Sequence, residues 1–122
     1  MIDEKLINQE HKQIIYELEN LLSTINLGQL TNVIKQFKNI FKIIKIHFKT
    51  EEIILKNNNS PLLIYQKEDH KNIKKIFIIN IKNIDKHNQK QTLFLIKQTL
   101  KIMTEHFIKE NTDFNKYYEI FK

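Results

Sequence analysis

The chain has 122 residues with 20 basic and 14 acidic side chains, a formal net charge of +6, one Gly, one Pro and no Cys. Without Cys there is no disulfide scaffold and no thiolate metal site, and one Gly and one Pro are too few for the turns of a sandwich or barrel. The apolar runs are only a few residues long, which excludes a membrane span. The opening residues lack the basic and apolar stretches of a secretory signal, so a cytoplasmic protein is expected.

The positive charge does not by itself indicate nucleic-acid binding. Every basic residue is Lys, and the densest local group is Lys71, Lys74 and Lys75. A nucleic-acid surface normally clusters its charge and uses Arg for bidentate contacts. The lysines are therefore interpreted as a solvated surface, and no nucleic-acid partner is expected.

Helical periodicity begins near the N-terminus and continues up to the single Gly. Apolar residues and one His recur at alternating steps of four and three, which is the stripe of a helix buried along one side. Gly28 follows this stripe, at a position where a left-handed residue would end the helix. The stripe consists of Ile7, His11, Ile14, Leu18, Leu21 and Ile25.

A second helix has the same rhythm and stops at three consecutive Asn, residues 57–59. Its stripe contains both apolar residues and two ionisable ones, and the spacing again favours one buried side. The stripe consists of Val33, Phe37, Ile40, Ile44, His47, Glu51 and Ile54.

Ser60 and Pro61 predict the start of a third helix, with Ser as N-cap and Pro in the first turn. Residues 85–89 turn the chain, a fourth helix follows, and residues 112–122 predict a short amphipathic tail that packs back. The third stripe contains His70, Ile73 or Lys74, Phe77, Ile81 and Ile84. The fourth stripe contains Leu95, Thr99, Ile102 and His106, flanked by Ile96, Leu100, Met103 and Phe107.

Four helices of about 20 residues with short connections predict an all-α fold, namely an antiparallel up-down-up-down four-helix bundle with a short C-terminal amphipathic tail. No internal repeat and no linker is evident in the sequence. One domain is therefore expected to fill residues 1–122.

Ionisable residues interrupt the apolar stripes, and each predicted helix contributes at least one. A buried ionisable group is costly unless it is paired, hydrogen-bonded or bound to a metal, and a lone His of this kind is usually a satisfied core residue. Imidazole and carboxylate are also the ligands that iron, zinc and manganese accept, and a bundle interior can collect them from different helices. The interrupting residues are His11, His47, Glu51, His70, Lys74 and His106.

The spacing within the second helix strengthens the metal-site interpretation. His47 and Glu51 are four residues apart, which places them one turn apart on one side of a helix, where they can share a metal. His106 and Glu110 have the same spacing, and the alternative interpretation of Glu110 is an ordinary surface Glu near a helix end. His87 lies in the turn between the third and fourth helices and is expected at the surface.

Four segments combine these residues as ordered motifs: residues 8–12 (Asn-Gln-Glu-His-Lys), 47–52 (His-Phe-Lys-Thr-Glu-Glu), 69–77 (Asp-His-Lys-Asn-Ile-Lys-Lys-Ile-Phe), and His106-Phe107 with Phe114. In order and helix placement they resemble the metal-ligand motifs of the hemerythrin family, the HHE-type cation-binding four-helix bundles. The second segment is similar to the His-Phe-x-x-Glu-Glu motif and is the most specific of the four.

This resemblance implies an oxo- or hydroxo-bridged di-iron centre that binds O2 reversibly. By that likeness, His11 and His47 serve one iron, His70 and His106 serve the other, and Glu51 bridges the two. The resemblance covers nearly the whole chain.

Two positions depart from the family pattern. Lys74 stands where the family has the second His of the third helix, and Asn111 stands where it has a bridging Asp. A protonated Lys cannot ligate a metal and repels a cation, whereas Asn keeps an oxygen but lacks the negative charge. Both changes weaken a two-metal site, chiefly at the iron held by His70 and His106.

The departures leave three outcomes open. In the first, two irons are held with Glu110 or Asp113 as the replacement carboxylate. In the second, one metal is held by the ligands of the first two helices. In the third, the site is empty and Lys74 pairs with Glu51 in its place.

The expected function is that of a hemerythrin-like non-haem iron protein that binds dioxygen as a carrier, store or sensor. No general base or activated nucleophile is evident, so an enzyme is not expected. The alternative function is that of a degenerate, metal-poor or metal-free helical bundle that acts as a structural or interaction module. The oligomeric state is left open.

Overall fold

The computed structural model is all-helical and describes the backbone of residues 4–121 and the side chains of residues 5–114. Four long helices joined by three short connections account for nearly all of the described chain. The predicted four-helix bundle is confirmed. The helices are α1 (Glu4–Asn26), α2 (Val33–Asn57), α3 (Leu63–Asn83) and α4 (Gln89–Phe121).

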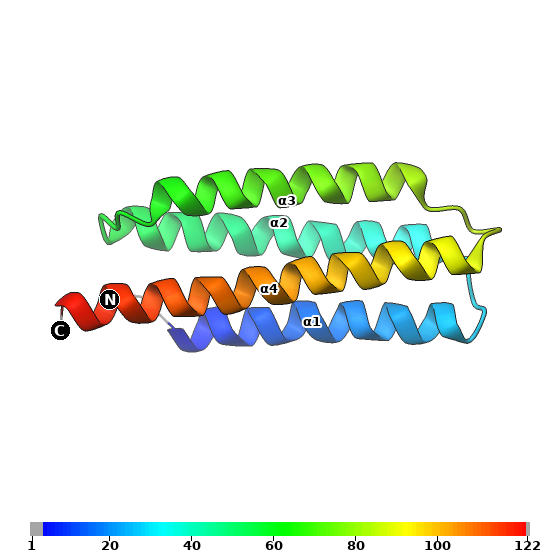
Figure 1. Ribbon diagram of the computed structural model, residues 1–122, viewed down its shortest axis with the longest axis horizontal. Helices are drawn as coiled ribbons and strands as arrows, with labels where there is room; N and C mark the ends of the chain where they lie inside the picture. The colour runs from blue at the N-terminus through cyan, green and yellow to red at the C-terminus, as the bar shows by residue number, and fades with distance from the viewer. Residues whose placement is uncertain (1–3, 122) are drawn as a thin grey trace.

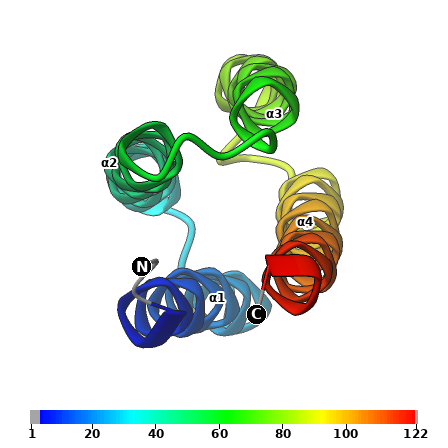
Figure 2. The same cartoon turned by 90° about the vertical axis from the view of Figure 1, so that its left-hand side faces the viewer.

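The helices lie at the four corners of a bundle, so that each packs against two neighbours (Figure 2). The contacting pairs are α1 with α2, α2 with α3, α3 with α4, and α4 with α1. The connections lie at alternate ends of the long axis, and each helix runs back alongside the one before it (Figure 1). Over the described residues, none of the four helices combines the length and apolar character that a bilayer crossing requires.

The first two helices end in the same hydrogen-bonded motif, with a left-handed residue just past the helix. Gly28 has a φ of 76°, and the amide of the residue after it donates to the carbonyl of Thr24 at 3.1 Å. Asn59 has a φ of 49°, and the amide of the residue after it donates to the carbonyl of Leu55 at 2.9 Å. Gly and Asn tolerate this conformation, which satisfies the last helical carbonyls. Both predicted helix ends are confirmed.

The third helix begins slightly later than the Ser60-Pro61 pair predicts. The Oγ atom of Ser60 accepts a hydrogen bond from the amide of Leu62 at 3.2 Å, and the amide of Leu63 donates to the carbonyl of Ser60 at 3.3 Å. Ser60 therefore closes a separate turn. The first helical hydrogen bond runs from the amide of Gln66 to the carbonyl of Leu62 at 2.9 Å.

The fourth helix follows the predicted turn and continues through the residues predicted as a tail. The Oδ1 atom of Asn88 accepts a hydrogen bond from the amide of Gln91 at 3.0 Å, which caps the helix start. No Gly or Pro follows Pro61 in the sequence, so nothing breaks α4 and its backbone runs to Phe121. The expectation of a separate tail is therefore wrong for the backbone of residues 112–121. The predicted packing of side chains 115–122 lies outside the described residues.

The predicted stripes are mostly buried, with a rotation of the buried face in the second half of the chain. In α3 the core position belongs to Ile73, and Lys74 is only half-buried. Asn80 is buried in that helix, where no core residue was predicted. In α4 the buried face lies between the two predicted stripes. Its buried residues come from both stripes, whereas Leu95, Leu100 and Ile102 are half-buried.

The buried residues of α1 and α2, apart from Phe41, each have a buried counterpart 59 residues further along the chain, and the counterpart of Phe41, Leu100, is half-buried. The expectation of no internal repeat is therefore wrong: the repeat lies in burial and register, and it was hidden because most exposed side chains differ between the two halves. Corresponding helices occupy opposite corners of the bundle (Figure 2). The first set is Ile7, His11, Ile14, Leu18, Leu21, Ile25, Val33, Phe37, Ile40, Ile44, His47, Phe48, Glu51 and Leu55, and its counterparts are Gln66, His70, Ile73, Phe77, Asn80, Ile84, Thr92, Ile96, Thr99, Met103, His106, Phe107, Glu110 and Phe114.

Candidate metal centre

The five predicted ligands lie at one level of the bundle interior, together with a sixth ionisable side chain. None of the six is more than 7 % exposed. Every helix contributes, because the stripe of each one carries an imidazole at this level. The residues are His11 on α1, His47 and Glu51 on α2, His70 on α3, and His106 and Glu110 on α4.

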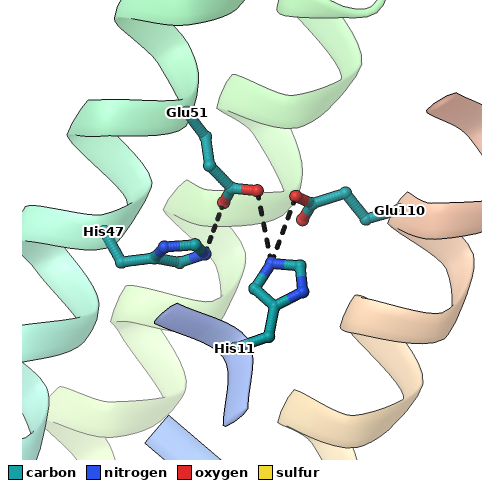
Figure 3. Close-up of side chains that lie close together, drawn as sticks. All are labelled: His11, His47, Glu51 and Glu110. Carbon is teal, nitrogen blue, oxygen red and sulfur yellow. Dashed lines mark ion pairs between the residues drawn. The ribbon is translucent and has the colours of Figure 1, made fainter. Parts of the chain in front are cut away.

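Their ligand atoms form two overlapping groups that share both glutamates. One group joins His11 and His47 to Glu51 and Glu110, and the other joins the remaining two histidines to the same glutamates. Within each group the ligand atoms lie within 4.8 Å of one another. Figure 3 shows the carboxylates of Glu51 and Glu110 turned toward each other, with the ring of His11 facing both. The arrangement offers two adjacent positions for a cation.

Equivalent contacts in the two halves of the chain have matching lengths. Within α2 and within α4, the His and the Glu four residues later are in contact, and each remaining His contacts the Glu of a neighbouring helix. The Nε2-to-carboxylate distances are 3.0 Å for His47–Glu51, 3.0 Å for His106–Glu110, 3.4 Å for His11–Glu110 and 3.4 Å for His70–Glu51. The inner part of the cluster therefore has approximate twofold symmetry.

A phenylalanine covers one imidazole on each side of the cluster. Phe107 stacks on His11 with ring centroids 3.8 Å apart, and Phe48 stacks on His70 with ring centroids 3.9 Å apart. Each Phe directly follows a cluster His in the sequence. It therefore lies beside the centre and points toward the neighbouring helix, where it covers that helix's His. These rings surround the imidazoles with apolar surface and limit the access of water.

The inner atoms of the cluster lack hydrogen-bond partners. Among the described side chains, the buried polar atoms without a partner belong to the six cluster residues, apart from Oε1 of Gln66. They include Nε2 of all four histidines and both carboxylate oxygens of Glu51 and Glu110. Each such atom costs about 1–3 kcal/mol when buried and unpaired. Native proteins satisfy buried polar groups with protein, water or an ion, and a cation satisfies imidazole and carboxylate lone pairs together.

Two further carboxylates contact the cluster from outside. Nδ1 of His47 lies 3.0 Å from Oε1 of Glu10, and Nδ1 of His70 lies 2.7 Å from Oε2 of Glu52. Because a carboxylate only accepts, each Nδ1 carries the proton and donates it. In the charged imidazole Nε2 also carries a proton and donates toward Glu51, whereas in the neutral imidazole Nε2 keeps the lone pair that binds a metal.

The electrostatics of the cluster favour the ionisation states that metal binding needs. Burial alone raises the pKa of Glu51, but the imidazoles of His11, His47 and His70 against its carboxylate hold that pKa below its usual range. Burial, with the neighbouring His70, lowers the pKa of His106 to about 4. At neutral pH the protein therefore presents an ionised Glu51 and a neutral His106.

The structure decides between the carboxylates that the sequence left open. Glu110 belongs to both ligand groups, whereas Asp113 is half-buried and belongs to neither group among the described residues. Asn111 is exposed. The sequence signal for Glu110 is its spacing of four from His106, the same as that of the α2 ligand pair.

The core position predicted for Lys74 is wrong. Lys74 is half-buried and lines a hollow between α2 and α3. The ion pairs of Glu51 among the described side chains are with histidines, so the predicted alternative pairing with Lys74 is not observed. The prediction that His87 is a surface residue is confirmed.

Sequence reasoning did not assign roles to Glu10 and Glu52. Each lies directly beside a cluster residue in the sequence, before His11 and after Glu51, which is a weak signal because adjacent helical residues point to different sides.

No family model matches the sequence, and no curated protein or solved structure matches it either. The geometry of the centre and the motif resemblance are therefore what bear on function.

Proposed function

We propose that this chain is a hemerythrin-like non-haem iron protein that holds two irons in the bundle interior and binds O2, as a carrier, store or sensor in the cytoplasm. The observation that carries the proposal is the sharing of Glu51 and Glu110 by two pairs of histidines. A carboxylate has two oxygens and can bridge two ions. Two bridging carboxylates between two imidazole pairs support a pair of metal ions better than a single ion.

The ligand chemistry favours iron and a diatomic ligand. Imidazole with carboxylate suits iron, zinc or manganese, and iron sites with few histidines and carboxylates keep open positions where O2 binds. Each group offers four protein ligand atoms at most, which leaves room for a small external ligand. The resemblance of residues 47–52 to the His-Phe-x-x-Glu-Glu motif of the hemerythrin family points the same way. Bound iron would supply the reversible O2 chemistry.

The side chains of this chain perform the remaining work. The lowered pKa of His106 keeps its imidazole neutral, so that Nε2 is available as a ligand without loss of a proton at neutral pH. Glu51 is ionised and supplies negative charge between the two positions. Phe48 and Phe107 shield the imidazoles from water, which protects a reactive centre from side reactions.

Iron content is the direct test of the proposal. Purified chain, loaded with ferrous iron without oxygen and desalted, is expected to retain two irons per chain and to gain a visible absorption band on exposure to air. Glu110→Gln removes one bridging charge and is expected to lose at least one iron. Glu105→Gln makes the same chemical change on the exposed side of α4 and is expected to retain both.

A folded chain that retains no iron after loading would contradict the proposal. In that case the His and Glu cluster would not bind iron, and the alternative function, a metal-free helical module, would replace the proposed one. Equal iron loss from Glu110→Gln and Glu105→Gln would instead show that the retained iron is bound elsewhere.

A further inference from the structure

Two hollows flank the metal centre at equivalent places in the two halves of the chain. The α1–α4 hollow has a volume of about 400 Å³ and is lined by residues of α1 and α4, including His11 and Phe107. The α2–α3 hollow has a volume of about 550 Å³ and is lined by residues of α2 and α3, including Phe48, which stacks on His70. Each hollow therefore has one of the two stacking phenylalanines in its wall.

The chemistry of the two hollows differs although their positions correspond. Five further wall positions match one to one, each pair being 59 residues apart. In the α2–α3 hollow these positions are charged, whereas in the α1–α4 hollow they are uncharged. The charged set is Lys45, Lys49, Glu52, Lys67 and Lys74, and the uncharged counterparts are Thr104, Ile108, Asn111, Asn8 and Ile15.

The symmetry also breaks at the carboxylates outside the cluster. Glu52 holds Nδ1 of His70, but its counterpart is Asn111, and Nδ1 of His11 is buried without a hydrogen-bond partner. Glu10 holds Nδ1 of His47 in the same way. Its counterpart Asp69 is one methylene shorter and pairs with Lys109 at 3.3 Å instead.

The supported and unsupported histidines fall on different edges of the centre. The two supported imidazoles, His47 and His70, both face Oε1 of Glu51, at 3.0 and 3.4 Å. The two unsupported imidazoles, His11 and His106, face Glu110, at 3.4 and 3.0 Å, and His11 also lies 3.6 Å from Oε2 of Glu51. Each metal position thus has one supported and one unsupported His, and the difference lies between the Glu51 edge and the Glu110 edge.

We infer that, given the proposed metal centre, Glu10 and Glu52 anchor its Glu51 edge, while metal ions and the small uncharged ligand exchange at the Glu110 edge through the α1–α4 hollow. A carboxylate on Nδ1 fixes the ring and raises the basicity of Nε2, and losing it typically weakens metal binding 10–100-fold. Imidazoles without this support dissociate more readily from a metal.

Charge supports the same division. Glu10, Glu51, Glu52 and Glu110 together carry four negative charges, which balance two divalent cations. An uncharged ligand gains nothing from the lysines of the α2–α3 hollow, whose hydration it would have to displace. The wall of the α1–α4 hollow, by contrast, carries one Lys and one Glu of opposite charge, Lys12 and Glu19, is otherwise free of Lys and carboxylates, and includes His11 itself.

The anchoring part is tested by metal retention, which does not depend on O2 chemistry. Glu10→Gln and Glu52→Gln are each expected to weaken ferrous-iron binding about 10–100-fold. Glu105→Gln, an exposed change on α4, is expected to leave it unchanged. Asn111→Glu gives His11 the carboxylate that Glu52 gives His70 and is expected to strengthen retention up to about tenfold. Melting of the metal-free variants shows whether each still folds.

The exchange part is tested by blocking each hollow with the same residue. Ile15→Trp fills the α1–α4 hollow and Lys74→Trp fills the α2–α3 hollow, and both positions are half-buried. Extraction of ferrous iron by 1,10-phenanthroline, an uncharged chelator, and association of O2 are both expected to slow tenfold or more in Ile15→Trp and to change less than twofold in Lys74→Trp. The exposed counterparts Thr104→Trp and Lys45→Trp repeat the comparison without touching a half-buried position.

Three results would overturn this inference while leaving the proposed function intact. In the first, the parent binds two irons and neither Glu10→Gln nor Glu52→Gln weakens their retention. In the second, the Trp substitutions in the two hollows slow iron extraction and O2 association equally. In the third, neither Trp substitution slows them. A parent that binds no iron would overturn the proposed function first.

Discussion

The two ends of the bundle core treat buried polar atoms in opposite ways. Toward the turn at Gly28 the core is mainly apolar, and its polar side chains are hydrogen-bonded: Nδ2 of Asn80 donates to Oγ1 of Thr99 at 3.1 Å, and that hydroxyl donates to the carbonyl of Leu95 at 2.9 Å. Toward the other end lie the four histidines and two glutamates, whose inner atoms have no hydrogen-bond partners.

The comparison separates polar residues that are hydrogen-bonded within the core from those that we propose to bind metal. Both ends carry buried polar residues on the same stripes, so burial alone does not distinguish them. What distinguishes them is whether the buried polar atoms have hydrogen-bond partners, as the side chains of Asn80 and Thr99 do within the core. The inner atoms of the centre have no such partners, and under the proposed function a bound cation supplies them.

The largest effect is expected from a cavity at the apolar end. Phe37 is fully buried and its ring lies 5.1 Å from that of Phe77. Phe37→Ala should lower the free energy of unfolding by about 3–5 kcal/mol, while iron content at low temperature stays at the parental value. Phe94→Ala, at a side chain that is 64 % exposed, should change stability by about 0.5 kcal/mol or less. Iron loss from folded Phe37→Ala protein would show that the two ends are not independent.

The next effect is an acid-induced loss of stability that originates at the end with the His and Glu cluster. The pKa of His106 is lowered to about 4 from the ordinary value of 6.5. Between pH 4 and 6.5 this His is therefore protonated in the unfolded chain but not in the folded chain. Stability of the metal-free protein should therefore fall as pH drops from 6.5 to 4, by about 3 kcal/mol from this residue.

Denaturant titration at several pH values measures this loss, and Glu51, whose pKa is also lowered, adds to it in more acidic solution. Replacing His106 by Gln should flatten the profile, and replacing the exposed His87 by Gln should not. A profile that is unchanged in the His106 variant would show that other groups cause the acid sensitivity.

A smaller effect is expected when the satisfied pair is broken. Thr99→Val keeps the shape of the side chain but leaves Nδ2 of Asn80 buried without its acceptor, which should cost about 1–3 kcal/mol. Thr104 makes the same hydroxyl contact to a helical carbonyl, at 2.8 Å, but on the exposed side of α4. Thr104→Val should therefore be nearly neutral. Chemical denaturation of both variants gives the difference, and equal costs would mean that the Asn80 contact adds no stability.

The fold was largely predictable from the sequence because it depends on local signals. Gly28 and Asn59 end helices through their own backbone conformation, and the stripes follow from helical geometry. The sequence does not decide which face of α4 is buried, because apolar residues lie on two adjacent faces of that helix. The repeat between the two halves keeps residue identity at the cluster, where His11, His47 and Glu51 match His70, His106 and Glu110, but elsewhere it is mainly a repeat of burial.

The centre was predictable where a position within one helix decides it, which includes the four histidines on the helix stripes. His47 with Glu51, and His106 with Glu110, are fixed by a four-residue step. Contacts between helices, such as that of Glu52 with His70, depend on helix packing and have no local signal. The family pattern has a bridging acid at the position of Asn111. In this chain the preceding residue, Glu110, is the one that turns inward.

The smallest effect is expected at that position. Asn111→Asp restores the acid that the hemerythrin pattern places there, yet Asn111 is exposed and belongs to neither ligand group. Asp also lacks the methylene with which Glu52, at the equivalent position, reaches its imidazole. Iron retention of Asn111→Asp should therefore equal that of the parent, whereas Glu110→Gln should lose at least one iron. If Asn111→Asp instead rescued the iron lost in Glu110→Gln, residue 111 would be able to turn inward, and the bridging edge at α4 would be mobile rather than fixed by the spacing of His106 and Glu110.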